Sequence, residues 1–483
     1  MQALPIFGCF LSILLVLIPS LDCKTTLLKK QTLPLSRIQT PAQNATREYE
    51  TFDEKEWNIF VYMAGQNDLF FAIDQNLEQL MSVSFGSLCN IIVQIDKFGT
   101  RDVIRARIKN GALSTYWRAS DTPASERSRN PRLYNSGAVE NFIDFLQTGM
   151  AQFKAKKQCV VIWDHGSGCF DPLKWRSLIC RPNEEIISGA TTRGMAFNDT
   201  YNYYLSNQDL TYALETISRT ALNNKKIAML GLDICHGGQV EIAAQVNHVV
   251  DYIVASEEVE LASGWNYAKA FAKVTTQVRC PSELGNDIVT AYKDTYISSV
   301  DYTLALYDLS SSPEGQNTTY FELLTQSIDS LALTLQALLR CPEKKIIGPV
   351  ITDVRMKKNL FCEFYDNEYI DLHLFLLNLQ NNLRLLLNQK NFRYDYPSST
   401  IMVQQAITLC LTSLELLYKV VPLYTAGIAF MGNPIRARGM SITFPLRSLH
   451  WSYTQTAFAQ KTHWFDFVKE CGAKRSASSP CIF

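Results

Sequence analysis

The chain is predicted to fold as an α/β protein in which helices surround a mostly parallel β-sheet. Short β-rich runs alternate along it with helix-like stretches, which is the pattern of parallel strands joined by helical crossovers. Two of these runs, at 159–162 and 227–232, are apolar throughout, as expected for strands buried on both faces. Each run is followed within a few residues by a reactive side chain, His165 or Cys235, and then by glycine.

The first half of the chain supplies the predicted sheet and the helices that cover it. Strands are expected at 57–63, 90–96, 159–162, 227–232 and 252–255, and helices at 68–81, 136–154, 209–217 and 239–246. A strong hairpin signal, Asn110-Gly111, lies between two further β-rich runs at 103–108 and 114–117. We therefore expect a small antiparallel excursion beside the parallel core.

The last third of the chain has a different pattern. Leucine-rich stretches with helical spacing lie at 324–338, 370–387 and 401–421, and the polar residues within the last two argue against membrane spans. A β-rich run at 439–444 stops at Pro445 and is expected to return to the sheet. The predicted organisation is an export or lipoprotein signal at 1–23, a polar linker at 24–55, an α/β core at 56–270, a helical subdomain with the returning strand at 271–470, and a tail at 471–483.

The N-terminus has the composition of an export signal. Residues 4–18 are almost wholly apolar, which is short for a membrane span of about 20 residues but suits the hydrophobic region of a signal peptide. Basic residues before the run are missing, and an uncleaved anchor is the alternative. Cys23 is a candidate for lipid attachment, although Asp22 is unusual before such a cleavage site. We expect an exported protein, whether secreted, periplasmic or anchored in the cell envelope.

Composition limits the partners and the cysteine chemistry. The 46 basic and 46 acidic residues cancel, so no overall charge favours nucleic acid as a partner. The 13 cysteines are irregularly spaced, and only Cys471 and Cys481 suggest a disulfide. No common ligand spacing supports a zinc site built from Cys159, His165, Cys169 and Cys180.

The thiol of Cys235 and the imidazole of His165 are the parts of a cysteine nucleophile and its base. Parallel strands end at one edge of their sheet, which is where ligands bind. The imidazole would take the thiol proton during attack and later protonate the leaving amine. The N–H groups of Gly166 and Cys235 are natural donors to an oxyanion. An inert buried thiol beside a structural histidine is the alternative, and the adjacent His236 is expected to be structural.

Five segments, in chain order, resemble the clostripain family of cysteine peptidases, which shares a clan with the caspases. They are WNIFVYMAGQND (57–68), WDHGSG (163–168), GLDICHGG (231–238), VASEEVELASGW (254–265) and GMSITFP (439–445). The resemblance spans about 57–470. It implies a caspase-like three-layer α/β/α core and endopeptidase activity on proteins or peptides, with His165 and Cys235 as a dyad that needs no cofactor.

The resemblance also implies cleavage after Arg or Lys, because Asp233 matches the family's acidic specificity residue. A carboxylate at the base of a pocket would pair with a guanidinium or an ammonium group. A strand-end cap is the alternative role for Asp233. The chain departs from the family pattern at Ser263, where a second acid is often found, so that Glu257, Glu258 or Glu260 would have to compensate. A second departure, His-Gly-Gly at 236–238, alters the surface beside the nucleophile.

A long connection at 171–206 separates the dyad residues and shows no regular pattern. Family members are often processed there by their own activity, so we expect either a self-processed two-chain form or a monomer. Basic cleavage points are Lys174, Arg176, Arg181 and Arg193, of which Arg181 is the poorest because Pro182 follows it. Calcium dependence also occurs in the family, and oxygen ligands are available from Asp199, Asp251 and the glutamates of 257–260.

Two other functions stay open on the sequence alone. A binding protein without activity can share this scaffold, because a fold does not license a function. A caspase-type peptidase selective for acidic residues is the second alternative, which the charge of Asp233 disfavours. The presence of both dyad residues favours an exported cysteine endopeptidase that cleaves after basic residues.

Overall fold

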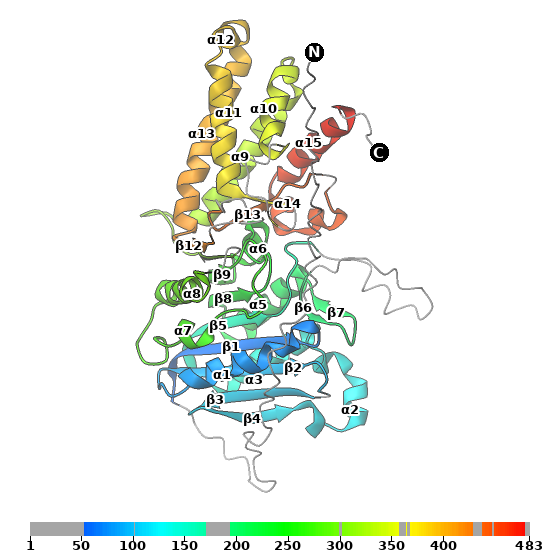
Figure 1. Cartoon of the computed structure of the whole chain (residues 1–483), viewed down its shortest axis with the longest axis vertical. Helices are drawn as coiled ribbons and strands as arrows, with labels where there is room; N and C mark the ends of the chain where they lie inside the picture. The colour runs from blue at the N-terminus through cyan, green and yellow to red at the C-terminus, as the bar shows by residue number, and fades with distance from the viewer. Residues whose placement is uncertain are drawn as a thin grey trace, which may run out of the picture. The chain divides into compact units, whose positions relative to one another are not determined.

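A nine-stranded sheet forms the centre of the protein, in the order β12-β10-β9-β8-β5-β1-β2-β3-β4 (Figure 1). The computed structural model describes residues 53–478 except 101, 171–193, 299–301, 357–363, 365–367, 428–436 and 447–448. The strands are β1 (Lys55–Gly65), β2 (Cys89–Lys97), β3 (Val103–Lys109), β4 (Ala112–Arg118), β5 (Ala155–Trp163), β8 (Ile227–Asp233), β9 (Val250–Ala255), β10 (Thr303–Asp308) and β12 (Leu423–Ala426). The five central strands, β9 to β2, are parallel, and two antiparallel strands flank them on each side.

Alternation of side chains along β1 gives the sheet two apolar faces. Ile59 and Val61 join one core cluster, whereas Phe60 and Tyr62 join the other. The first cluster includes α1 (Ile73–Val83), α7 (Tyr267–Ala270) and α8 (Pro281–Tyr296), and the second includes α3 (Val139–Gln152), α5 (Asn207–Ala221) and α6 (Val240–Val246). The three-layer α/β/α sandwich expected from the family resemblance is therefore confirmed.

The predicted hairpin is present between β3 and β4, which pair antiparallel. Its turn residues, Asn110 and Gly111, both have a positive φ, of 52° and 74°. Glycine and asparagine adopt this conformation most readily, which explains why the dipeptide marks a tight hairpin.

The C-terminal half of the chain adds a group of helices whose core is continuous with the second face of the sheet. They are α9 (Tyr320–Arg340), α10 (Lys344–Met356), α11 (Leu372–Leu387), α12 (Lys390–Asp395), α13 (Pro397–Val420), α14 (Ala457–Lys461) and α15 (Trp464–Ser478). A reciprocal capping box between Thr319 and Glu322 begins α9. By length and composition, α13 is the one described helix that could cross a membrane, but it packs against α9 and α11 as a bundle helix does (Figure 1).

The returning strand differs from the prediction. β13 (Ser441–Thr443) pairs with β11 (Tyr369–Asp371) in a separate two-stranded sheet. It contacts the segment after β8 through a bridge between Gln239 and Ser441 and through hydrogen bonds to Gly238 and Glu241. The strand that joins the large sheet is β12, antiparallel to β10. Because β12 occupies the free edge of β10, residues 441–443 pair elsewhere. The sandwich also extends past the predicted boundary at 270, since α8 and β10 belong to it.

Candidate active site

The register of two central strands brings His165 and Cys235 to the same edge of the sheet. β5 and β8 pair in parallel, with Trp163 opposite Asp233. His165 lies two residues after Trp163, and Cys235 lies two residues after Asp233. The two loops are in direct contact, because a methyl group at Gly166 would lie 2.4 Å from the carbonyl oxygen of Cys235. Position 166 thus accepts glycine and no larger residue without displacing the nucleophile loop.

The thiol of Cys235 is held by the backbone of Glu260. The Glu260 N–H donates to Sγ at 3.3 Å, and the thiol lies 3.9 Å from the Glu260 carbonyl oxygen, to which it donates. Burial raises the pKa of the Cys235 thiol to about 11; the Glu260 N–H opposes this rise and the neighbouring carboxylates of Glu258, Asp233 and Asp164 add to it. The thiol is therefore protonated at neutral pH.

The imidazole of His165 is turned toward a carboxylate. Its Nε2 lies 2.6 Å from Oδ1 of Asp68, in the short helix η2 (Asp68–Phe71) that follows β1. The preceding Asn67 donates from Nδ2 to the Asp164 carboxylate at 2.6 Å, which ties the end of β1 to the histidine loop. No hydrogen bond joins His165 to Cys235, both of which lie in the described part of the chain. Asp68 was not among the predicted site residues, although it belongs to the Asn-Asp pair of the first family-like segment.

The two predicted oxyanion donors have no hydrogen-bond acceptor in the part of the chain that the structure describes. Among the described residues, neither the Gly166 N–H nor the Cys235 N–H donates a hydrogen bond. Unused N–H groups beside a thiol are what an oxyanion site needs, since the negative oxygen of a tetrahedral intermediate must find donors there.

The segment that follows β9 supports the nucleophile loop along its length. The His236 N–H donates to the Glu258 carbonyl at 3.1 Å, and the Gly238 N–H donates to the Ser256 carbonyl at 2.6 Å. His236 is buried, with a positive φ of 55° and its Nδ1 3.4 Å from the Glu257 carbonyl oxygen. These contacts agree with the structural role predicted for His236.

Asp233 forms a buried carboxyl pair with Glu260. The two residues are only 4% and 8% exposed. Asp233 accepts hydrogen bonds from the Trp265 N–H at 3.2 Å and the Tyr267 hydroxyl at 2.6 Å. Neither oxygen of Glu260 has a well-aligned hydrogen-bond partner among the described residues.

Burial raises the pKa of both carboxyls, and the charge of Asp233 raises that of Glu260 further, to well above its usual range. The donors to Asp233 stabilise its ionised form, so the shared proton belongs on Glu260. No lysine, arginine or histidine of the described residues forms an ion pair with either carboxyl. Of the three glutamates that could compensate for Ser263, Glu260 is the one that pairs with Asp233, whereas Ser263 is exposed on the turn beside the Asp233 carboxylate.

A second buried carboxyl pair joins the sandwich to the helical part of the chain. Glu257 and Asp371 are fully buried. Glu257 Oε1 accepts from the Gly439 N–H at 2.7 Å, and the two Asp371 oxygens accept from the N–H groups of Leu374 and Arg438, both at 2.6 Å. Burial raises the pKa of Asp371 to about 6 and that of Glu257 well above its usual range, the charge of Asp371 adding to the latter.

Several of the remaining candidates lie outside the described residues. The processing candidates Lys174, Arg176, Arg181 and Arg193 lie outside the described residues, as do Cys23, Cys180 and Cys481. In the described ranges, no group of three or more His, Cys, Asp or Glu side chains is placed to hold a metal ion. Of the calcium candidates, Asp251 lies 3.9 Å from the ammonium of Lys226, and Glu257 faces Asp371.

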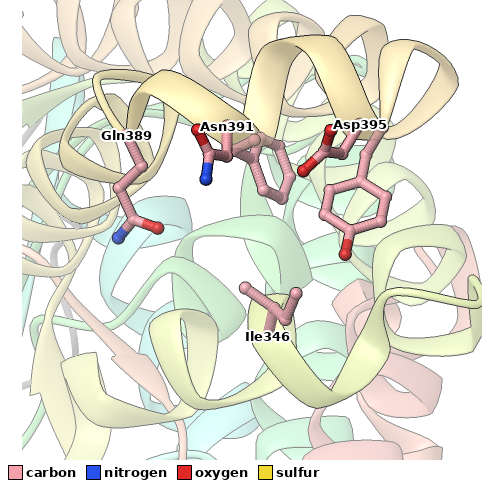
Figure 2. Close-up of a pocket in the computed structure, with 6 residues that line it drawn as sticks. Ile346, Gln389, Asn391 and Asp395 are labelled. Atoms are coloured by element: carbon pink, nitrogen blue, oxygen red, sulfur yellow. The ribbon is translucent and has the colours of Figure 1, made fainter.

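A separate cavity of about 400 Å³ lies between α10 and the α12 region (Figure 2). It is lined by Ile346, Gln389, Asn391, Phe392, Asp395 and Tyr396. These residues come from elements other than those that carry the dyad, so this cavity is not part of the candidate active site.

Known proteins resemble this chain in sequence family and in fold. The model of the clostripain family, peptidase C11, matches residues 61–413. A secreted C11 cysteine protease from Bacteroides thetaiotaomicron, "iotapain", superposes with a TM-score of 0.54 at 16% identity, covering 85% of this chain and 99% of its own. An inactive zymogen of a C11 protease from Parabacteroides distasonis gives 0.53 at 15% identity, covering 85% and 98%.

The B. thetaiotaomicron protease in complex with an irreversible peptide inhibitor gives a TM-score of 0.52 at 15% identity, covering 86% of this chain and 99% of its own. No curated protein sequence matches the chain. At these identities the structural likenesses establish the fold, and the family match covers most of the sandwich and the helices beyond it. The chain belongs to the clostripain family and is a cysteine peptidase.

Proposed function

We propose that this peptidase cleaves proteins or peptides after Arg or Lys, with Cys235 as the nucleophile and His165 as the general acid–base. The observation that carries the selectivity is the buried pair of Asp233 and Glu260 beside the nucleophile, which lacks a cation among the described residues. Burying two carboxyls without a cation is costly, and a substrate guanidinium or ammonium group supplies the missing charge.

The reaction begins from a protonated thiol, since the pKa of Cys235 is raised. His165 therefore acts as a general base during attack, rather than as the partner of a resting thiolate. Sγ bonds to the scissile carbonyl carbon, and the N–H groups of Gly166 and Cys235 donate hydrogen bonds to the oxyanion that forms. The resulting imidazolium returns its proton to the leaving amine, and water then hydrolyses the thioester with His165 again as base.

Assembly of this arrangement requires two local changes. His165 must exchange part of its contact with Asp68 for one with the thiol, and the thiol must leave the Glu260 backbone. Entry of a basic side chain also requires movement of the turn at 261–264, because the buried Gly264 lies against the Asp233 carboxylate. Catalytic hydrogen bonds often tighten only in the substrate complex, which fits a resting form of this kind.

Maturation by self-cleavage and export belong to the same proposal. The cleavable sites are Lys174, Arg176 and Arg193, with Arg181 the poorest, and one structural neighbour is an inactive zymogen. Export is supported by the apolar stretch at 4–18 and by a neighbour described as secreted. A fragment pattern that is the same in the wild type and in Cys235→Ala would exclude self-cleavage.

A fluorogenic peptide panel tests the proposal. Peptides that differ only before the cut, with Arg, Lys, Asp or Asn, are assayed with the wild type and with Cys235→Ala. We expect cleavage of the Arg and Lys peptides by the wild type alone. Preference for Asp would indicate the caspase-type alternative, and a folded wild type that cuts none of the peptides would indicate a binding protein.

A further inference from the structure

We propose that Phe70, Phe71 and Phe98 form an apolar subsite for the first two residues after the scissile bond. This proposal rests on the proposed function, because it needs a peptide bound across Cys235 and His165. It adds a selectivity on the leaving side of the cut, separate from the basic residue before it.

The three phenylalanines form an exposed aromatic cluster. Phe70, Phe71 and Phe98 are 37%, 59% and 50% exposed. The ring of Phe70 lies 5.7 Å from that of Phe98 and 6.4 Å from that of Phe71, centroid to centroid. Aromatic rings gathered in water at one place retain a large apolar area that a bound partner would bury.

The cluster is built next to the catalytic histidine. Phe70 and Phe71 belong to the same short helix, η2, whose first residue, Asp68, contacts His165. Phe98 directly follows β2, and its N–H donates to the Gly65 carbonyl at 2.8 Å. The rings therefore come from the ends of β1 and β2, the two strands that follow β5 in the sheet.

The order of the strands gives the substrate a direction. Along the edge of the sheet the strand order β9, β8, β5, β1, β2 places Glu260, which follows β9, first. Asp233 and Cys235, both from the end of β8, come next, then His165 after β5, and then the aromatic cluster after β1 and β2. The acids hold the residue before the cut. His165 protonates the leaving amine, so the residues after the cut lie on its side of Cys235, where the rings are.

The charges around the cluster favour apolar side chains and disfavour acidic ones. The Lys97 ammonium is bound by Asp74 at 2.7 Å, so it is not available to a substrate carboxylate. Asp68, in the same short helix as Phe70 and Phe71, is exposed, and Asp199 lies near it. Burial raises the pKa of Asp199, and the charge of Asp68 adds to this rise against the opposing effect of His165. An acidic residue after the cut would meet these carboxylates.

The test uses peptides with Arg before the cut and Leu, Phe, Ser or Asp at the first two positions after it. The same peptide ending in Arg methyl ester is the reference, because its leaving group, methanol, does not reach the cluster. For the wild type we expect kcat/KM about tenfold higher for Leu or Phe than for Ser. The double variant Phe71→Ser, Phe98→Ser should lose this preference but hydrolyse the methyl ester normally.

Phe85→Ser is the matched control, since Phe85 is 67% exposed and precedes β2, at the opposite end of that strand. It should keep the wild-type preference. A wild type without preference for apolar residues, or a double variant that retains it, would overturn the subsite. A concentration-dependent dimer that the double variant alone loses, with its preference unchanged, would assign the rings to self-association instead. Failure of the wild type to hydrolyse the methyl ester would refute the proposed function and the subsite together.

Discussion

His165 Nε2 lies 2.6 Å from the Oδ1 atom of Asp68, which begins the short helix η2 after the neighbouring strand β1. A carboxylate at this distance orients the imidazole and stabilises the imidazolium that forms when the thiol proton is taken. Asp68 is 82% exposed, so the contact is screened by water and its contribution is modest. We assign Asp68 as a positioning residue for the proposed base.

Asp68→Asn should therefore lower kcat about tenfold, equivalent to about 1.4 kcal/mol, and leave KM nearly unchanged. Asp68→Glu should restore part of the loss. Steady-state kinetics on an Arg peptide measure both. Glu215→Gln is the matched control, because Glu215 and His248 form an exposed pair of similar length, 2.7 Å, away from the site. An equal loss in both variants, or a change confined to KM, would remove the role given to Asp68.

Removal of either acid of the buried pair should reduce selectivity for basic residues. Asp233→Asn and Glu260→Gln are each expected to lower kcat/KM for an Arg peptide by about 100-fold, since each leaves the substrate cation with one carboxylate fewer. Ser263→Asp should not replace Glu260, because Ser263 lies on the exposed turn. Alkylation of Cys235 by iodoacetamide is the control, as it needs no basic side chain. Unchanged Arg selectivity in Glu260→Gln would place the second acid elsewhere.

The same pair predicts a pH dependence of substrate binding. Because the pKa of Asp233 and of Glu260 is raised in the free enzyme, a guanidinium must displace the shared proton. KM for the Arg peptide should rise as the pH falls through the range in which the pair takes up its proton, and Glu260→Gln should weaken this dependence. Measuring KM across this range in both proteins tests the prediction, and parallel profiles would contradict it.

The pair of Glu257 and Asp371 predicts how stability varies with pH. The folded pKa of Asp371, about 6, exceeds its ordinary value of 3.8, so its stabilising contribution is present below about pH 3.8 and is lost as the pH rises through about 6. The pKa of Glu257, raised by burial and by the charge of Asp371, acts in the same direction. Glu257→Gln mimics the protonated acid and should flatten this part of the stability curve, whereas Glu257→Ala should destabilise by about 2 kcal/mol. Denaturant unfolding of the three proteins at several pH values measures this, and identical slopes would exclude the shared proton.

A methyl group at Gly166 should displace the nucleophile. The added carbon would lie 2.4 Å from the Cys235 carbonyl oxygen and within 3 Å of the Ile234 side chain, so the loop has to shift. Gly166→Ala is expected to destabilise by about 1–3 kcal/mol and to abolish most activity. Gly472→Ala, where nothing lies within 4 Å, is the control and should be neutral. Full activity and unchanged stability in Gly166→Ala would show that the His165 and Cys235 loops can move apart without loss of free energy.

Some of this architecture was accessible from the sequence because it depends on local patterns. The apolar runs that precede His165 and Cys235 predict buried parallel strands, and adjacent parallel strands bring their ends together whatever the rest of the fold. The contact between Asp68 and His165 needs the neighbour relation of β1 and β5, which no local pattern encodes. The pairing of Glu260 with Asp233 likewise depends on a tertiary contact, because the 256–260 segment must lie beside the nucleophile loop. Both 423–426 and 441–443 form strands, and which of them pairs with β10 depends on how the C-terminal helices place the two segments.

The assignment of Cys235 as the nucleophile of an Arg- or Lys-directed peptidase is tested most directly by covalent labelling. The wild type, Cys235→Ala and Cys280→Ala are treated with an irreversible inhibitor that carries arginine before a thiol-reactive ketone, and the labelled peptide is mapped by mass spectrometry; Cys280 is an exposed cysteine away from the site. We predict one label per chain, on Cys235, in the wild type and in Cys280→Ala, and none in Cys235→Ala. Labelling that persists in Cys235→Ala would contradict the assignment of the nucleophile. An equal labelling rate with an inhibitor that carries an uncharged residue in place of arginine would contradict the selectivity.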